Sequence, residues 1–163
     1  MPLQSLTQAY LSVKVFKKLF LILIYCRIFA MLKLNMAPFL LNHIALSVKN
    51  VDASIEFYQK VFQFEEIENT ASNSKTRWLS LGEGRQLHLI PRPNLEVITN
   101  KAVHFALSTS NLEEFVKHLV HLEIEYSDWT NTIKKDYVRK DGVEQFYFQD
   151  LDGYWIEVNN AIQ

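Results

Sequence analysis

Three histidines and one glutamate lie in strand-like segments where their side chains could bind a metal ion. His43 and His104 each begin such a segment, whereas His88 and Glu157 each lie within a later one between apolar neighbours. A charged glutamate in apolar surroundings is unfavourable unless it is paired or bound to a cation. Imidazole and carboxylate groups together suit divalent Zn, Ni, Mn, Co or Fe. We therefore take His43, His88, His104 and Glu157 as candidate metal ligands.

An internal repeat relates these four positions. Residues 43–50 recur at residues 104–111, with histidine, alanine, leucine, serine and asparagine in the same places. An amphipathic stretch follows each copy, from Val51 and from Leu112, and its apolar spacing predicts a helix. Asn50 and Asn111 stand where a side-chain oxygen would cap the helix N-terminus. Taken singly, each candidate ligand is more often an ordinary strand residue, and it is the repeat that favours a shared site.

Strand-like segments complete each copy of the repeat. Turn-forming residues separate them, and they are expected at residues 64–69, 76–81, 85–91, 124–130, 143–150 and 154–159. The predicted order is βαβββ, twice. This corresponds to an α+β fold in which two βαβββ units form a curved mixed sheet around a metal cleft. His118 and His121, on the second predicted helix, are expected to pack or to face solvent.

The first 38 residues differ in character from the rest. They contain five basic residues and no acidic one, around an apolar run at residues 19–26. A bilayer-spanning helix needs about 20 apolar residues, so this run is too short to cross a membrane. We consider a gene-model extension or tail, a signal or membrane-associating segment, or a helix that packs on the domain. The predicted domains are therefore 1–38, an N-terminal extension, and 39–163.

Composition narrows the classes of function. The chain has 163 residues, a formal net charge of -1 and one cysteine. The charge balance gives no electrostatic reason to expect nucleic acid or an anionic membrane as a partner. A single cysteine excludes a disulfide within the chain and a thiolate metal cluster. We expect a cytoplasmic protein that acts on a small molecule, with membrane association less favoured.

Two segments resemble the vicinal oxygen chelate superfamily, which includes glyoxalase I, bleomycin-resistance proteins and extradiol dioxygenases. Residues 43–62 are similar to its first strand and helix, and residues 146–158 to its closing hairpin, with Leu151 where proline is usual. The resemblance covers about residues 39 to 160. It implies that His43, His104 and Glu157 are metal ligands, and that His88 takes the place of a fourth ligand that is glutamate in glyoxalase I. Ser47 stands where glyoxalase I has an arginine that binds glutathione.

The resemblance also implies a function. We expect a metal-dependent lyase or isomerase of lactoylglutathione lyase type, acting on a 2-oxo or hemithioacetal substrate, with Glu157 as the general base. The alternatives are a fosfomycin-type thiol transferase and a small-molecule-binding member without turnover. Related proteins of this size commonly dimerise and complete each site with residues from both chains, so we expect a homodimer. Residues 131–140 are polar and basic, and could form a loop that covers the cleft.

Overall fold

The computed structural model describes residues 18, 20–22, 38–94 and 96–161. The chain divides into two compact units, residues 1–40 and residues 41–163. In the first unit, residues 18 and 20–22 are helical. Most of the predicted N-terminal extension lies outside the described residues, so its three interpretations stay open. No helix within the described part of the chain is long and apolar enough to span a membrane.

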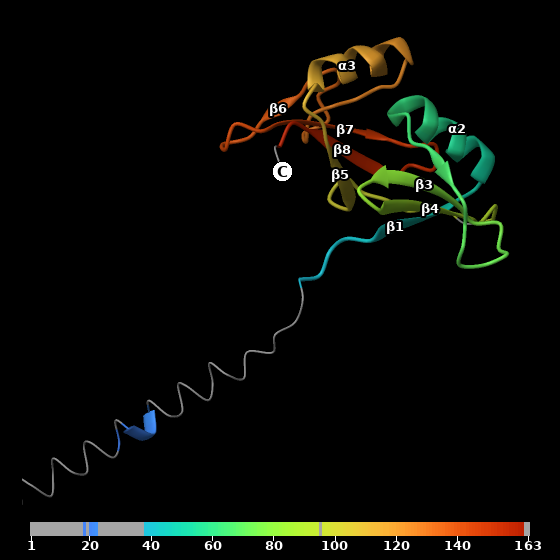
Figure 1. Ribbon diagram of the computed structural model, residues 1–163. Helices are drawn as coiled ribbons and strands as arrows, with labels where there is room; N and C mark the ends of the chain where they lie inside the picture. Colours follow the sequence, from blue (N-terminus) through green and yellow to red (C-terminus); the bar gives the residue numbers. More distant parts are fainter. Residues whose placement is uncertain (1–17, 19, 23–37, 95, 162–163) are drawn as a thin grey trace, which may run out of the picture. The chain divides into compact units, whose positions relative to one another are not determined.

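The second unit contains the βαβββ order twice (Figure 1). The first module consists of β1 (His43–Val48), α2 (Val51–Phe62), β2 (Glu66–Ile67), β3 (Arg77–Gly82) and β4 (Arg85–Pro91). The second consists of β5 (His104–Ser108), α3 (Leu112–His121), β6 (Tyr137–Val138), β7 (Glu144–Gln149) and β8 (Trp155–Asn159). The predicted α+β class and duplicated unit are therefore confirmed.

Each module forms its own four-stranded mixed sheet. The strand orders are β1-β4-β3-β2 and β5-β8-β7-β6. In each sheet the first strand pairs in parallel with the last, and the other pairings are antiparallel. The two strands that carry His43 and His104, β1 and β5, are consequently edge strands of their sheets.

Side chains cap both helices as the sequence predicts. The Asn50 side chain accepts hydrogen bonds of 3.1 Å from the backbone N–H groups of Asp52 and Ala53. The Asn111 side chain accepts a longer one, 3.4 Å, from the backbone of Glu114. Each cap begins its helix directly after the edge strand, because it satisfies N–H groups that have no partner within the helix. The start of each helix thus fixes where the strand before it must end.

The strand predicted over residues 124–130 is wrong in extent. Within that segment only Ser127 forms isolated bridges, to Ile133 and Tyr147, and the outer strand of the second sheet is β6 instead. Asp128 is the physical reason, because its Oδ1 accepts hydrogen bonds of 2.8 Å from the Thr130 hydroxyl and from the Thr132 backbone. A side chain that binds its own backbone two to four residues later turns the chain and ends a strand. The segment 131–140, which was expected to form a covering loop, also differs in part, because Tyr137–Val138 form strand β6.

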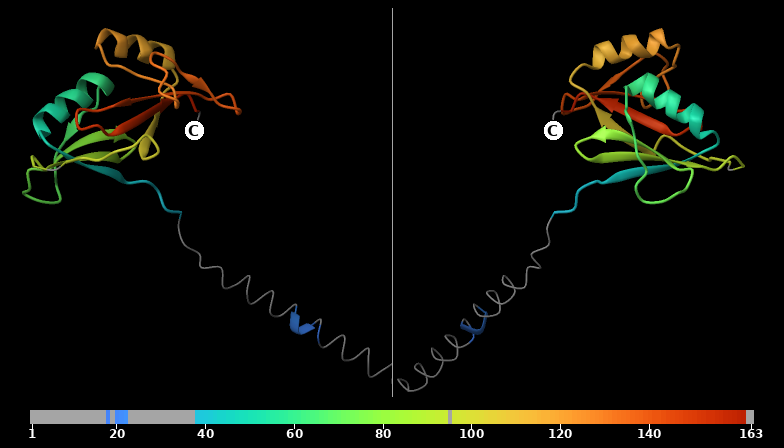
Figure 2. Two further views of the ribbon diagram at one scale, coloured as in Figure 1. Left: turned by 180° about the vertical axis from the view of Figure 1, so that it is seen from behind. Right: turned by 45° about the vertical axis from the view of Figure 1, so that its right-hand side comes forward.

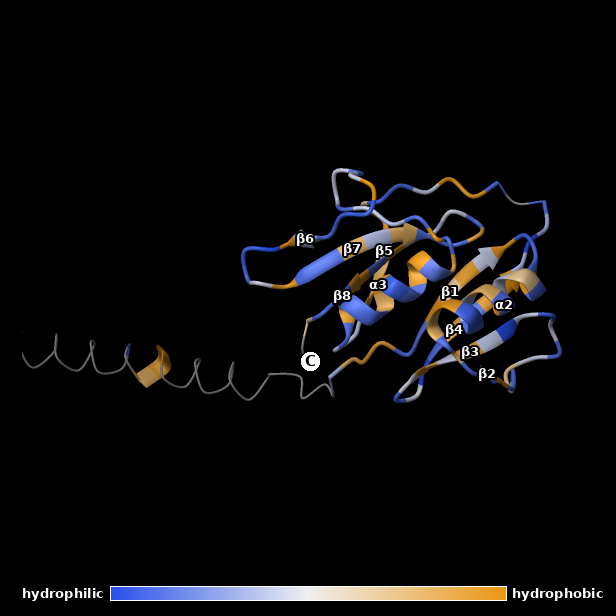
Figure 3. Ribbon diagram, turned by 90° about the horizontal axis from the view of Figure 1, so that it is seen from above, coloured by the Kyte–Doolittle hydropathy of each residue, from blue (hydrophilic) through white to orange (hydrophobic). Residues whose placement is uncertain are grey.

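The two modules share one hydrophobic core. Figures 1 and 2 show α3 over β7 and β8, and Figure 3 shows α2 and α3 side by side. Phe62 of α2 stacks on Phe115 of α3 and Phe148 of β7, with ring centroids 5.4 and 5.9 Å apart. His118 donates from Nε2 to the Lys60 carbonyl at 2.9 Å, which agrees with its predicted packing role. The helix-bearing faces of the two sheets thus pack together within one chain. The opposite faces of the sheets are not part of this packing.

A buried carboxylate also joins the modules. Asp150 Oδ2 accepts a hydrogen bond of 2.7 Å from the Tyr58 hydroxyl of the other module. Its Oδ1 accepts from the backbone N–H groups of Asp152 and Tyr154, at 3.0 and 2.9 Å. Burial raises the pKa of Asp150 above its ordinary value of 3.8, although these hydrogen bonds oppose the shift. The group is therefore both a link between modules and a source of pH-dependent stability.

We expect Asp150→Asn to remove a pH dependence from the stability of the fold. A carboxyl group with a raised pKa binds its proton more tightly in the folded state, so its contribution to stability falls as pH rises through the folded pKa. Wild type should therefore lose stability relative to Asp150→Asn as pH rises from the ordinary carboxyl pKa of 3.8 through the higher pKa of the folded state. Urea unfolding of both proteins across this range measures the difference. A difference that stays constant or grows in favour of wild type would contradict the assignment.

Candidate metal centre

The second sheet carries His104 and Glu157 on its open face, away from the helix. His104 begins β5, and Glu157 lies on the neighbouring strand β8, with Ala106 as its paired residue. Alternate residues of a strand share a face, so His104, Glu157 and Tyr147 of β7 all lie on this side. His104 Nε2 is 3.3 Å from Glu157 Oε2. Two of the four predicted ligands therefore meet within one module.

The proton on His104 is placed so that Nε2 can bind a cation. His104 Nδ1 lies 2.8 Å from the Lys101 carbonyl, which can only accept, so Nδ1 carries the hydrogen in the neutral ring. Nε2 then presents a lone pair to Glu157, whose carboxylate is also an acceptor. Two acceptors that face each other are unfavourable unless a cation or a proton lies between them. A backbone carbonyl that holds the other ring nitrogen is also the usual support of a metal-binding histidine.

Glu157 is buried, with 6% of its surface exposed, and both of its oxygens accept hydrogen bonds. The Tyr147 hydroxyl donates to Oε2 and the Asn159 amide to Oε1, each at 2.7 Å. Gln145 in turn donates to the Tyr147 oxygen at 2.6 Å. Burial and the Glu157 hydrogen bond raise the pKa of Tyr147 well above its ordinary value, so its hydroxyl remains a donor. This network holds both oxygens of the carboxylate in position on the sheet.

The first sheet carries His43 and His88 on its own open face. The rings of His43 and His88 stack with centroids 4.3 Å apart, and His88 stacks on Trp78 at 4.2 Å. His43 Nδ1 donates to the Asn42 side-chain oxygen, and His88 Nε2 donates to that of Gln86, each at 2.8 Å. Burial, followed by the charge of His43, lowers the pKa of His88, which favours the neutral ring that metal binding requires.

The four predicted ligands form two pairs rather than one cluster. Within the described residues, no group of three histidine, cysteine, aspartate or glutamate side chains is placed to hold a metal ion. The expected cleft of one chain therefore does not gather all four. The reason is the shared core: the helix-bearing faces pack together, so the open faces with their two pairs are not opposed within the chain. The ligand set itself stays a prediction.

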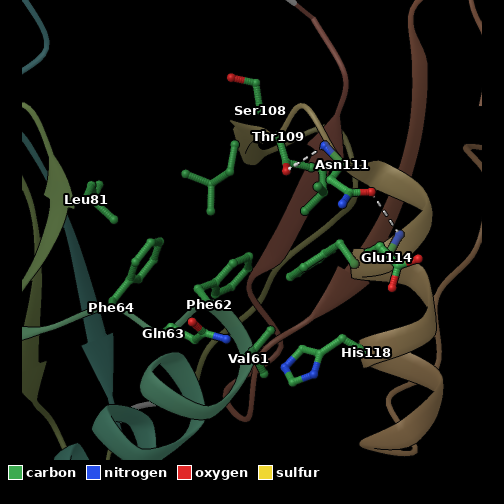
Figure 4. Close-up of a pocket in the computed structure, with 13 residues that line it drawn as sticks. Val61, Phe62, Gln63, Phe64, Leu81, Ser108, Thr109, Asn111, Glu114 and His118 are labelled. Atoms are coloured by element: carbon green, nitrogen blue, oxygen red, sulfur yellow. Dashed lines mark hydrogen bonds between the residues drawn. The ribbon is translucent and has the colours of Figure 1, made fainter.

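A groove of about 490 Å³ lies elsewhere, on the helix-bearing side between the modules (Figure 4). Phe62, Phe64 and Leu81 line one side, and Asn111 and Glu114 of the second module line the other. None of the four predicted ligands lines it. No sequence pattern predicts this groove, because its walls come from residues that serve mainly as core.

Comparison with known proteins places the chain in a family. The model of the glyoxalase/bleomycin resistance protein/dioxygenase superfamily matches residues 40–158. The chain belongs to this superfamily. A protein from Arabidopsis thaliana named Glyoxylase I 4 is 31% identical over 130 residues, covering 74% of this chain and 70% of the relative. Superfamily membership confirms the resemblance that the two sequence segments carry.

The chain is also similar to fosfomycin-resistance proteins. The metallothiol transferase FosB of Staphylococcus haemolyticus is 28% identical over 125 residues, covering 74% of this chain and 83% of that one. The crystal structure of FosX from Listeria monocytogenes superimposes with a TM-score of 0.60 at 25% identity, covering 78% of this chain and 96% of that one. The relatives thus include more than one kind of enzyme, so the family alone does not select the reaction.

The donor pair of the second sheet fits a divalent metal. Metal–nitrogen and metal–oxygen bonds of about 2.1 Å at tetrahedral to octahedral angles place two donors about 3.0–3.4 Å apart. The 3.3 Å between His104 Nε2 and Glu157 Oε2 lies in that range. Sequence reasoning identified these two residues but missed Lys101, Tyr147 and Asn159 as the groups that hold them in place. No local sequence signal marks these three, because their contacts form only when strands pair.

Proposed function

We propose that the protein is a metal-dependent lyase or isomerase of glyoxalase I type. In this proposal it acts on a small 2-oxo or hemithioacetal substrate. The observation that carries the proposal is the facing pair of acceptors, His104 Nε2 and Glu157 Oε2, 3.3 Å apart beside a fixed network of donors. Membership of the superfamily and the similarity to Glyoxylase I 4 support the choice of reaction.

We further propose that a homodimer completes the metal centre. The edge strands β1 and β5 carry exposed open faces, with His43 and Ala45 on one and His104 and Ala106 on the other. Edge strands have free N–H and C=O groups that can pair with another chain. If β1 of one chain lies beside β5 of its partner, His43 and His88 approach the partner's His104 and Glu157. A two-fold axis then produces two such sites per dimer.

A divalent metal in this site would polarise two adjacent substrate oxygens and stabilise negative charge that develops on them. The protein's own residues supply the rest of the chemistry. Glu157 would accept the proton from the substrate carbon that bears the hydroxyl oxygen and return it to the neighbouring carbonyl carbon, so that no proton is gained or lost overall. Tyr147 and Asn159 hold its two oxygens in position. Because His88 stands where a second carboxylate is expected, Glu157 is the one carboxylate of the predicted ligand set and must serve in both proton steps.

An activity assay tests the proposed reaction. The purified protein is loaded with Zn, Ni, Mn, Co or Fe in turn and supplied with hemithioacetals formed from several thiols. We expect turnover with at least one metal and one thiol, and Ser47 leads us to expect weak preference for glutathione. Protein that binds about one metal ion per site but converts no hemithioacetal would contradict the proposal. Similarity to the metallothiol transferase FosB favours thiol transfer as the second candidate. Consumption of thiol only in the presence of fosfomycin would establish that alternative.

A further inference from the structure

A well-anchored loop lies beside His104 and is not explained by the metal ligands. Lys101, three residues before His104, donates from Nζ to three oxygens of this loop. They are Ser127 Oγ at 3.0 Å, the Asp128 carbonyl at 2.8 Å and Asn131 Oδ1 at 2.6 Å. The ammonium group also lies 4.5 Å from the centre of the Trp155 ring, a favourable cation–π contact. All three donors of Lys101 are therefore committed to holding residues 127–131.

The loop is also held from within. Asp128 is buried, with 4% of its surface exposed, and accepts hydrogen bonds from Thr130 and Thr132. Asn131 has a φ of 68° and donates its backbone N–H to the Asp128 carbonyl at 3.2 Å. The backbone on both sides of Trp129 is thus held in place, and the Trp129 ring packs against His104 and Tyr147. A preorganised side chain loses little conformational entropy when it contacts a ligand.

Trp129 presents an exposed aromatic surface next to the donor pair. Its ring contacts His104 edge-on, with centroids 6.4 Å apart, and Tyr147 in the same manner at 5.6 Å. Nevertheless 47% of Trp129 is exposed, although an indole this size usually buries more of its surface. The open surface lies within reach of a substituent on any ligand that is bound beside His104 and Glu157.

We propose that Trp129 is a specificity-determining residue that selects substrates with a flat, apolar substituent next to the chelated oxygens. An aromatic substituent suits it best, because offset or edge-to-face aromatic contacts add to the burial of apolar surface. Lys101 is the positioning residue that holds the loop and keeps Trp129 in place. This inference rests on the proposed metal site. It assigns to Trp129 a preference for the substituent of the substrate, which the metal ligands alone do not determine.

Two hydroxamates separate this inference from the proposed site. Acetohydroxamate and benzohydroxamate both offer two adjacent oxygens to a metal, and they differ in a methyl or a phenyl substituent. Calorimetric titration of the zinc-loaded protein gives the ratio of their affinities. We expect Trp129→Ala to lower the preference for benzohydroxamate about fivefold to tenfold while the affinity for acetohydroxamate stays the same. Trp129→Phe should keep most of the preference, because it retains an aromatic face.

Matched variants complete the experiment. Tyr137→Ala removes another aromatic residue of the second sheet, exposed to 46%, and should leave the ratio unchanged. Lys101→Met keeps the backbone carbonyl that contacts His104 and removes only the ammonium group that holds the loop. It should therefore lower the ratio with acetohydroxamate affinity intact, a result that a general loss of stability would not produce. A ratio that is the same in wild type and Trp129→Ala overturns the inference and leaves the metal site standing. Failure of zinc-loaded wild type to bind either hydroxamate overturns the metal site and the inference together.

Discussion

Replacing Glu157 with glutamine is expected to lower metal affinity at least about 100-fold, since even the loss of an outer hydrogen-bond partner costs about 10- to 100-fold. Glutamine keeps the size of the side chain, and its oxygen can still accept from Tyr147 or Asn159. It lacks the negative charge, however, that balances a divalent ion beside His104. The fold should persist, because the apolar core does not depend on this charge. His104→Ala should have a similar effect, since it removes the facing nitrogen donor.

Elemental analysis and zinc titration of the purified variants measure this loss. His121→Ala is the matched control, because His121 is an exposed histidine of α3 outside the predicted ligand set. It should retain the metal content and affinity of wild type. Equal metal content in wild type, Glu157→Gln and His104→Ala would refute the assignment of these ligands.

A mixed dimer is expected to recover metal binding that neither parent variant has. His43→Ala damages the contribution of the first module, and Glu157→Ala damages that of the second. If each site combines the first module of one chain with the second module of its partner, a heterodimer of these variants contains one doubly damaged site and one intact site. The heterodimer should therefore bind about half as much zinc as wild type. Co-expression with two different affinity tags, followed by sequential purification, isolates it for titration.

The control for this experiment combines two variants of the same module. A heterodimer of His104→Ala and Glu157→Ala has damage in the second module of both chains, so both of its sites are defective. It should bind no more zinc than either homodimer. This control separates true sharing of a site from any general stabilisation caused by mixing two chains.

The duplicated fold was predictable because its signals are local. The repeat of residues 43–50 at 104–111, the caps Asn50 and Asn111, and the turn residues each act within a few positions along the chain. The last strand of each module was accordingly predicted nearly to the residue, as 85–91 and 154–159 against Arg85–Pro91 and Trp155–Asn159. In the structure Glu157 lies on the face of β8 opposite to that of the core-forming Ile156 and Val158.

The features that could not be predicted depend on contacts between residues that are far apart in the sequence. Asp128 ends the strand expected at 124–130 through hydrogen bonds that only the folded loop reveals. Lys101 lies in a linker that carries no motif, yet its ammonium group fixes the loop that holds Trp129. The division of the ligands into two pairs follows from packing of Phe62 against Phe115 and Phe148, which places the helix sides of both modules together. Sequence patterns reveal which face of a strand is apolar, but not which apolar face it meets.

The zinc stoichiometry of the purified heterodimer of His43→Ala and Glu157→Ala tests the shared metal centre most directly. A centre shared between two chains should bind about half an ion per chain in this heterodimer, against about one in wild type and none in either parent homodimer. A heterodimer that binds no zinc while wild type binds one ion per chain would contradict the shared site, because the ligands would then have to come from a single chain.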